Sequence, residues 1–181
     1  SNGLVDGPFP EHYEPVESPV ENPLHPDVSA SPATFMYDEA AGRPNRFGTV
    51  NEYPYVATSY RLTEHEHYVT QHVERLVKLQ PEAFVEIPKG LAGEKGIETG
   101  DMVRVWSKRG KLEVRALVTG RLGAQQIDGR KTYQIGIPIH WGYVGIKTGD
   151  HWLANALTPF VGDATVRTPE FKAFLVNVEK I

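Results

Sequence analysis

The densest group of chemically capable side chains is the run Thr63-Glu64-His65-Glu66-His67. Imidazole and carboxylate groups are common metal ligands, but His65 and His67 are two residues apart and would point to different faces of a helix. Zinc-peptidase helices place their histidines four residues apart. A solvated helix start is a second interpretation. A ligand-binding loop is the third, in which N–H groups at a helix N-terminus favour a diphosphate and Glu64 accepts from a base or sugar.

A second group stands at the end of an apolar run, in Ile137–Tyr143. Here His140, Trp141 and Gly142 place a polar ring, a large flat ring and a flexible backbone side by side. This arrangement suits a flat heterocycle that stacks on an aromatic ring. The alternative is a core tryptophan beside a histidine whose hydrogen bonds are satisfied within the protein.

A third group combines Asn155 and Thr158 with Asp163 and Lys172. Asp163 follows a glycine, so we expect it in a turn, where its carboxylate is able to accept from the two neighbouring N–H donors of a guanine. Lys172 offers a point charge to a phosphate. Taken one at a time, each of these residues is also an ordinary surface polar group.

The composition excludes several classes of function. The chain has no cysteine, which rules out thiolate metal sites, iron–sulfur ligands and a cysteine nucleophile within it. No Ser-His-Asp arrangement and no glycine-rich phosphate loop is readable. The net charge of −4 gives no basic face for nucleic acid, and no apolar run approaches the roughly 18 residues that cross a bilayer. We therefore expect no catalytic residue, no metal ligand, no nucleic-acid partner and no membrane insertion.

The elements that must position these groups are short. We expect strands wherever β-branched and aromatic residues alternate with polar ones, and helices where apolar residues recur every three or four positions. Thr63 and Glu66 have the spacing of a capping box, which predicts a helix that buries Val69, Val73, Leu76 and Val77 and stops before Pro81. The expected strands are 55–61, 84–87, a hairpin over 102–118, 133–139 and 174–178, with short helices at 91–97 and 151–157. Short strands with small helices and glycine turns predict a mainly β barrel.

The first third of the chain differs from the rest. Nine of the fourteen prolines lie between Pro8 and Pro54, and each one fixes its own φ and biases the preceding residue toward extended forms. We therefore expect residues 1–54 to be an extended proline-rich arm and residues 55–181 to be the barrel domain. The arm is either docked on another surface or a disordered linker.

Two stretches resemble a known superfamily. Pro81–Ile87 and Gly96–Ser107, the latter followed by Arg109-Gly110, are similar to the C-terminal domain of molybdopterin oxidoreductases. The resemblance implies a double-psi β-barrel of the aspartate-decarboxylase-like type, with short helices. It also implies that the domain helps bind bis-molybdopterin guanine dinucleotide.

Further motifs narrow the resemblance to the large subunit of respiratory formate dehydrogenases. They are Asp6–Pro15, Tyr60–His65, Ile137–Tyr143, Leu157–Asp163, Thr168–Lys172 and the ending Phe174–Lys180. Carried over residue by residue, the resemblance implies cofactor contacts in three segments. The implied residues are Thr63, Glu64, His65 and His67; His140 and Trp141; and Asn155, Asp163, Phe171 and Lys172.

The resemblance also implies a role within a larger enzyme. The parent subunit would oxidise formate to carbon dioxide with molybdenum or tungsten, as in anaerobic respiration, while this domain binds and orients the cofactor and is not itself catalytic. Its partners would be the remaining domains of the subunit, then iron–sulfur and membrane subunits, on the periplasmic face of the bacterial inner membrane. We expect the isolated domain to be empty. Another molybdopterin oxidoreductase, or a stand-alone β-barrel binding module, is the alternative.

Overall fold

Alternating apolar and polar residues build the centre of the fold. The computed structural model describes residues 15–20, 34–127, 129–142, 145–146, 152–163 and 167–181. Strands β4 (Met102–Trp106) and β5 (Lys111–Thr119) pair antiparallel, as the sequence predicts. Val103 and Val105 point into the core and are fully buried, whereas Arg104 between them forms ion pairs on the outer face.

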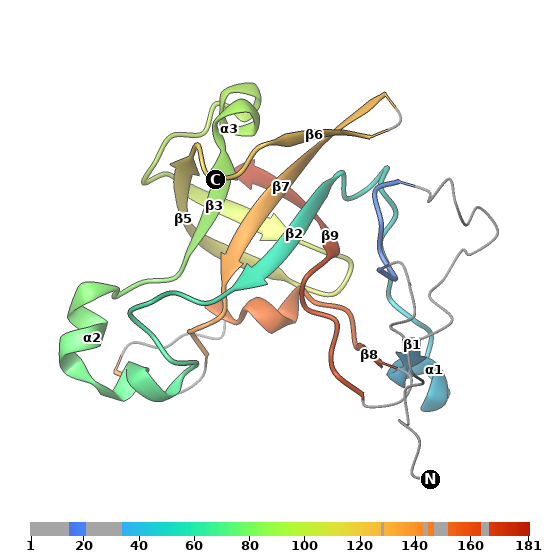
Figure 1. Ribbon diagram of the computed structural model, residues 1–181, viewed down its shortest axis with the longest axis horizontal. Coiled ribbons are helices and arrows are strands. Elements are labelled where there is room, and N and C mark those ends of the chain that lie inside the picture. Colours follow the sequence, from blue (N-terminus) through green and yellow to red (C-terminus); the bar gives the residue numbers. More distant parts are fainter. Residues whose placement is uncertain (1–14, 21–33, 128, 143–144, 147–151, 164–166) are drawn as a thin grey trace, which may run out of the picture.

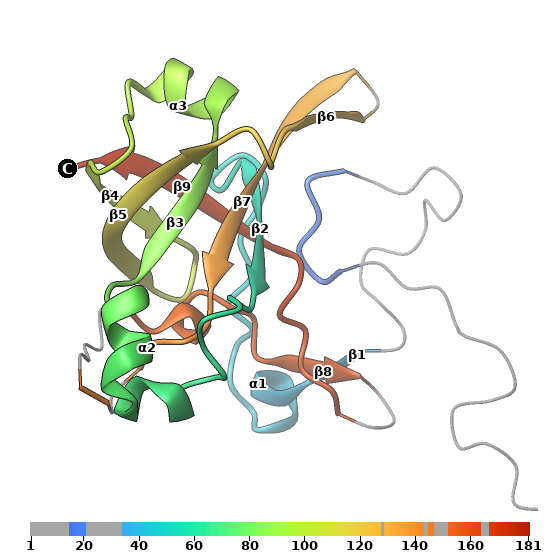
Figure 2. The same cartoon turned by 60° about the vertical axis from the view of Figure 1, so that its left-hand side comes forward.

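Six strands close into a barrel (Figures 1 and 2). Besides the β4–β5 hairpin they are β2 (Tyr55–Tyr60), β3 (Phe84–Pro88), β7 (Arg130–Pro138) and β9 (Phe174–Lys180). Their order is β2-β9-β4-β5-β3-β7, and pairing of β7 with β2 closes the ring. The β2–β7 and β3–β5 pairs are parallel, and the other pairs are antiparallel. The predicted mainly β barrel is confirmed.

Three strands were not predicted. Strand β6 (Ala124–Ile127) pairs with the start of β7, and this hairpin extends beyond the barrel wall (Figure 2). Strands β1 (Thr34–Met36) and β8 (Val161–Asp163) form a separate two-stranded sheet, with helix α1 (Tyr37–Ala40) beside it. These strands are short, and β6 is mostly exposed, so their sequences carry little alternating hydrophobicity.

The prediction of a continuous helix that begins at Thr63 is wrong. A 3₁₀ helix, η1 (Val69–His72), is separated from α2 (Glu74–Leu79) by Val73, whose backbone is extended. His67 has a positive φ of 44°, which a continuous helix does not allow. Because the turns are not continuous, Val69 and Val73 are exposed, and of the four apolar residues only Val77 is buried. Thr63 caps no helix.

Two other predicted helices are present with shifted limits. Helix α3 (Lys89–Lys95) ends at Gly96, which takes the left-handed conformation that suits glycine. The turn expected over 151–157 is the 3₁₀ helix η3 (Ala154–Ala156), and His151 lies outside the described residues. Among the described residues, no helix is long and apolar enough to cross a membrane.

The described part of the proline-rich arm contacts the barrel of its own chain. Glu17 is fully buried, and its carboxylate accepts a hydrogen bond from the backbone N–H of Leu175, 158 residues away in β9. Tyr37 stacks on Phe160 with ring centroids 4.6 Å apart. The Asp6–Glu14 part of the arm motif lies outside the described residues.

Candidate functional site

The parallel strands β2 and β7 end together, and a cavity lies beyond their carboxyl ends. Their register aligns Tyr60 with Pro138, so the segments that follow both strands leave the barrel on the same side, toward α2 and β8 (Figure 1). The cavity has a volume of about 770 Å³. Its lining consists of Ser59, Arg61, His67, Tyr68, Ile139, Trp141, Gly142, Leu153, Asn155, Thr168, Pro169, Phe171 and Lys172.

The cavity is cationic. Arg61 and Lys172 both line it, and no acidic residue is among its described lining residues. Burial lowers the pKa of Lys172 below its ordinary value, and repulsion from Arg61 lowers it further. The Lys172 ammonium donates to the backbone carbonyl of Ser59 at the end of β2. Two like charges held close together favour the binding of an anion between them.

Arg61 also fixes the neighbouring loop. Its Nε and Nη2 atoms lie 3.3 and 3.0 Å from Nε2 of His67. The exposed Glu66 carboxylate lies 3.3 Å from the same nitrogen. His67, with its positive φ, therefore turns its ring toward the cavity rim, next to the guanidinium of Arg61.

His140 stabilises this loop through hydrogen bonds to its backbone. It is fully buried, and its Nε2 accepts a hydrogen bond of 2.7 Å from the backbone N–H of Leu62. Its Nδ1 lies 3.1 Å from the carbonyl of His67, so this nitrogen carries the proton and donates. Burial lowers the pKa of His140, which keeps the ring neutral in this tautomer. His140 thus holds both ends of the Leu62–His67 loop.

Trp141 and His65 pack edge to face beneath the loop. Their ring centroids are 5.7 Å apart, and the ring nitrogens of His65 contact Thr70 Oγ1 and the Gln80 carbonyl. Only 2% of Trp141 is exposed, which leaves little of its ring face for the stacking that the sequence suggested. Within the described part of the chain, the buried Trp141 Nε1 and the buried side-chain amide of Gln71 have no hydrogen-bond partner.

A second cavity of about 760 Å³ adjoins the first, because Asn155, Pro169 and Phe171 line both. Arg46 and Arg109 are among its other lining residues. These arginines come from the arm and from the β4–β5 turn, and sequence reasoning did not select either. The spacing of the arginines along the chain gives no signal of this proximity.

The structure brings together five of the ten residues selected from the sequence. The residues that line the first cavity are His67, Trp141, Asn155, Phe171 and Lys172. His65 and His140 lie behind it, with their nitrogens engaged within the chain. Thr63, Glu64 and Asp163 are not among its lining residues, and Asp163 pairs with Thr34 in the β1–β8 sheet. Arg61 was missed as a site residue, although its place at the end of a predicted strand was a usable signal.

Comparison with known proteins identifies the domain. Residues 55–175 match the family described as "Molydopterin dinucleotide binding domain". The chain belongs to this family.

Sequence relatives of this family member are parts of much longer proteins. The chain is 52% identical to "Formate dehydrogenase-O major subunit" of Escherichia coli (strain K12), over 98% of this chain and 17% of that protein. It is 40% identical to "Formate dehydrogenase subunit alpha" of Megalodesulfovibrio gigas, again over 98% of this chain and 17% of the relative. The chain therefore spans about one sixth of the length of these curated relatives.

A solved structure shares the fold of this chain. "Acetylene Hydratase from Pelobacter acetylenicus" superposes with a TM-score of 0.62 at 16% identity, over 96% of this chain and 21% of that one. At this identity the likeness concerns the fold alone.

The residues of the first cavity fit the ligand of this family. A dinucleotide carries a diphosphate, which suits the cationic pair Arg61 and Lys172 in a lining without described carboxylates. It also carries polar heterocycles, which suit the side-chain amide of Asn155 in the same lining. The donor set is therefore compatible with a pterin dinucleotide.

Proposed function

We propose that this chain is part of the large subunit of a formate dehydrogenase and that it binds the guanine dinucleotide portion of bis-molybdopterin guanine dinucleotide. The single observation that carries the proposal is the cationic cavity at the ends of β2 and β7, in a domain of this family. The formate dehydrogenase assignment rests on the high identity to subunits of that name over nearly the whole chain.

Direct contacts are proposed for the residues that line the cavity. Arg61 and Lys172 hold the diphosphate, and Asn155 offers hydrogen bonds to a heterocycle. Phe171 and His67 complete the wall. His65 and His140 act from behind by fixing the loop that carries His67. Contacts of Thr63, Glu64 and Asp163 with the cofactor stay predictions from the resemblance alone.

When bound, the cofactor would supply the two-electron redox chemistry through its molybdenum or tungsten. The residues of this chain would bind and orient it. The buried carbonyl and imidazole contacts of His140 fix the loop before the ligand arrives, so less ordering remains to be done on binding. Because the isolated chain would supply only part of the site, we expect it to bind nucleotide weakly and to be empty on its own.

Organisation and context follow the same proposal. Residues 1–54 form an arm, residues 55–181 form the cofactor-binding domain, and the remaining domains of the subunit cover the open cavity. Iron–sulfur and membrane subunits then carry the electrons onward in anaerobic respiration, at the periplasmic face of the bacterial inner membrane. A different molybdopterin oxidoreductase is the second candidate. The chain is also 32% identical to a "Nitrate reductase" of Symbiobacterium thermophilum, over 71% of this chain and 16% of that protein.

Titration of the 181-residue chain with GDP tests the nucleotide proposal, with amide NMR shifts as the readout. We expect millimolar GDP to shift the amides of His67, Trp141 and Lys172, and we expect UDP to do so less. The double variant Arg61→Gln/Lys172→Gln should abolish these shifts. The matched control Lys78→Gln removes an exposed lysine of α2 that pairs with Glu74 outside the cavity, and it should bind like the parent chain.

The alternatives have distinct outcomes. Equal shifts with GDP and UDP would reduce the site to a diphosphate site without guanine preference. Shifts in residues far from β2 and β7 would contradict the proposed location. Assay of the whole subunit for formate and nitrate turnover separates the two parent enzymes.

A further inference from the structure

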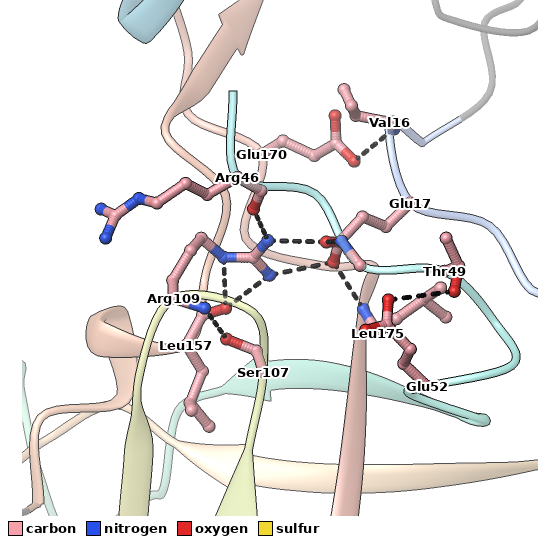
Figure 3. A network of polar contacts seen from close by, with 11 residues as sticks. Val16, Glu17, Arg46, Thr49, Glu52, Ser107, Arg109, Leu157, Glu170 and Leu175 are labelled. Atoms are coloured by element: carbon pink, nitrogen blue, oxygen red, sulfur yellow. Dashed lines mark hydrogen bonds and ion pairs between the residues drawn. The ribbon is translucent and has the colours of Figure 1, made fainter. Parts of the chain in front are cut away.

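A carboxylate of the proline-rich arm, that of Glu17, is buried against the barrel, and its oxygens accept hydrogen bonds from four donors (Figure 3). Glu17 accepts from the backbone N–H of Gly48 at 2.6 Å and from that of Leu175 at 2.8 Å. Nη1 and Nη2 of Arg109 donate to the two carboxylate oxygens at 2.6 and 2.9 Å. The side chains of Glu17 and Arg109 are 0% and 6% exposed. A bidentate ion pair excluded from water in this way has a fixed geometry.

Arg109 also forms hydrogen bonds to one wall of the candidate site, so its fixed position restrains that wall. Its Nε and Nη2 donate to the carbonyl of Leu157 at 2.9 and 2.7 Å (Figure 3). Leu157 directly follows η3, whose Asn155 lines both cavities. The adjacent Gly110 also approaches η3 closely, since a Cβ placed there would lie 2.7 Å from the carbonyl oxygen of Ala156. The position of Asn155 therefore depends on the β4–β5 turn.

The neighbouring arm residue reaches the other wall. The backbone N–H of Val16 donates to Glu170 Oε1 at 3.1 Å (Figure 3). Glu170 directly precedes Phe171 and Lys172, which line the first cavity. The carbonyl of Phe171 in turn accepts from the Ser59 hydroxyl at 2.8 Å, which ties this segment to the end of β2.

Adjacent arm residues thus hold two walls that are separate in the sequence. We propose that Glu17 is a positioning residue for the nucleotide site. Its carboxylate sets the place of η3 through Arg109, and it anchors the arm so that the N–H of the adjacent Val16 holds the 170–172 segment at Glu170. This inference rests on the proposed function for its ligand, whereas the positioning itself is a property of the chain without ligand. It assigns to the arm a role in binding that its distance in sequence from the site does not suggest.

The variant Glu17→Gln tests the proposal, because it keeps the volume and removes the charge that Arg109 faces. Its matched control is Glu52→Gln, which removes another arm carboxylate that reaches the barrel, at Lys108 Nζ 3.6 Å away, without contact to Leu157 or Glu170. Arg109→Lys is a conservative second variant that keeps the charge but loses the planar fork. All are compared at a temperature where each is fully folded.

Two readouts are needed. The first is amide hydrogen exchange without ligand: Glu17→Gln should speed exchange roughly tenfold at Ala156, Leu157 and Glu170, with no such change at Val85 or Val114 in the barrel core. The second is the Kd for GDP, which should rise at least about fivefold in Glu17→Gln and stay unchanged in Glu52→Gln. Arg109→Lys should lie between the parent chain and Glu17→Gln in both measurements.

The outcomes separate the two proposals. Unchanged exchange at η3 and 170–172, or equal acceleration throughout the barrel, would overturn the positioning role. Local acceleration with an unchanged GDP Kd would also overturn it as a determinant of binding. If the parent chain does not bind GDP, the proposed function fails for the isolated chain, and the exchange pattern alone then decides whether Glu17 positions the two walls.

Discussion

The two sides of the cavity are held by different kinds of interaction. On one side, the Leu62–His67 loop is fixed by His140, a neutral buried ring with one donor and one acceptor satisfied. On the other side, η3 is fixed by Arg109, whose charge is balanced by the buried carboxylate of Glu17 in the arm. Both devices connect segments far apart in the sequence, but only the second depends on a pair of charges.

This difference has an energetic consequence. A neutral hydrogen-bonded group costs little to bury, and its loss leaves unsatisfied neutral partners. Removing one member of a buried ion pair leaves an uncompensated charge, which costs considerably more. The η3 side should therefore be more sensitive to substitution than the loop side.

The largest effect is expected for Arg109→Met, which leaves the Glu17 carboxylate buried without its cation. We expect the free energy of unfolding to fall by about 3–5 kcal/mol, measured by urea denaturation. The control Lys108→Met, at the neighbouring exposed residue, should cost about 1 kcal/mol or less. Equal losses of unfolding free energy in both variants would mean that the buried ion pair stabilises the fold no more than an exposed one.

A smaller loss is expected for His140→Ala. The N–H of Leu62 and the carbonyl of His67 would lose their partner, and a void would remain, so we expect about 2–4 kcal/mol. His72→Ala, at an exposed histidine of η1, is the control and should change stability little. If His140→Ala costs more than Arg109→Met, the ranking of the two sides is reversed.

The contact between the β4–β5 turn and η3 is tested by Gly110→Ala. Its Cβ would meet the backbone oxygen of Ala156, which cannot rotate away as a side chain would, so we expect a loss of about 1–3 kcal/mol. Gly93→Ala in α3 has open space and should be neutral or stabilising by up to about 1 kcal/mol. A thermal-shift series on the two variants measures this difference, and equal midpoints would contradict the close approach.

The smallest expected effect is a pH dependence at Glu170, in the wall formed by residues 170–172. The pKa of Glu170 is raised from 4.5 to about 7, chiefly by burial; the Val16 N–H and Arg109 oppose this rise, and the nearby carboxylate of Glu17 adds to it. Because the folded state holds this proton more tightly, the group's contribution to stability is complete below about pH 4.5. It is lost as the pH rises through about 7.

The variant Glu170→Gln isolates that contribution. Between pH 5 and pH 8, its urea midpoint should fall less than that of the parent chain. Parallel curves for the two proteins would show that Glu170 does not titrate in this range in the folded state.

Much of the barrel was predictable from the sequence. Apolar residues such as Val103 and Val105 alternate with polar or charged ones, which predicts the β4–β5 hairpin. Gly96 predicts the end of α3. The broken helix after Thr63 was not predictable in the same way. The capping-box spacing and apolar periodicity were both present, but His67 and Val73 adopt backbone conformations that end helical turns.

The candidate site was predictable only in part. Residues of its local motifs, such as His67, Trp141 and Lys172, were selected from the sequence and line one cavity. Glu17 and Arg109 were not selected, although they were expected in the arm and in a turn. Their 92-residue separation leaves no periodic signal, and only the folded chain shows that they meet.

A structure of the whole subunit loaded with its cofactor tests the proposed site most directly. We expect the diphosphate of the guanine dinucleotide to lie within hydrogen-bonding distance of Arg61 and Lys172, with η3 against the same ligand. Density for another segment of the subunit in this cavity, with the dinucleotide elsewhere, would contradict the proposed site.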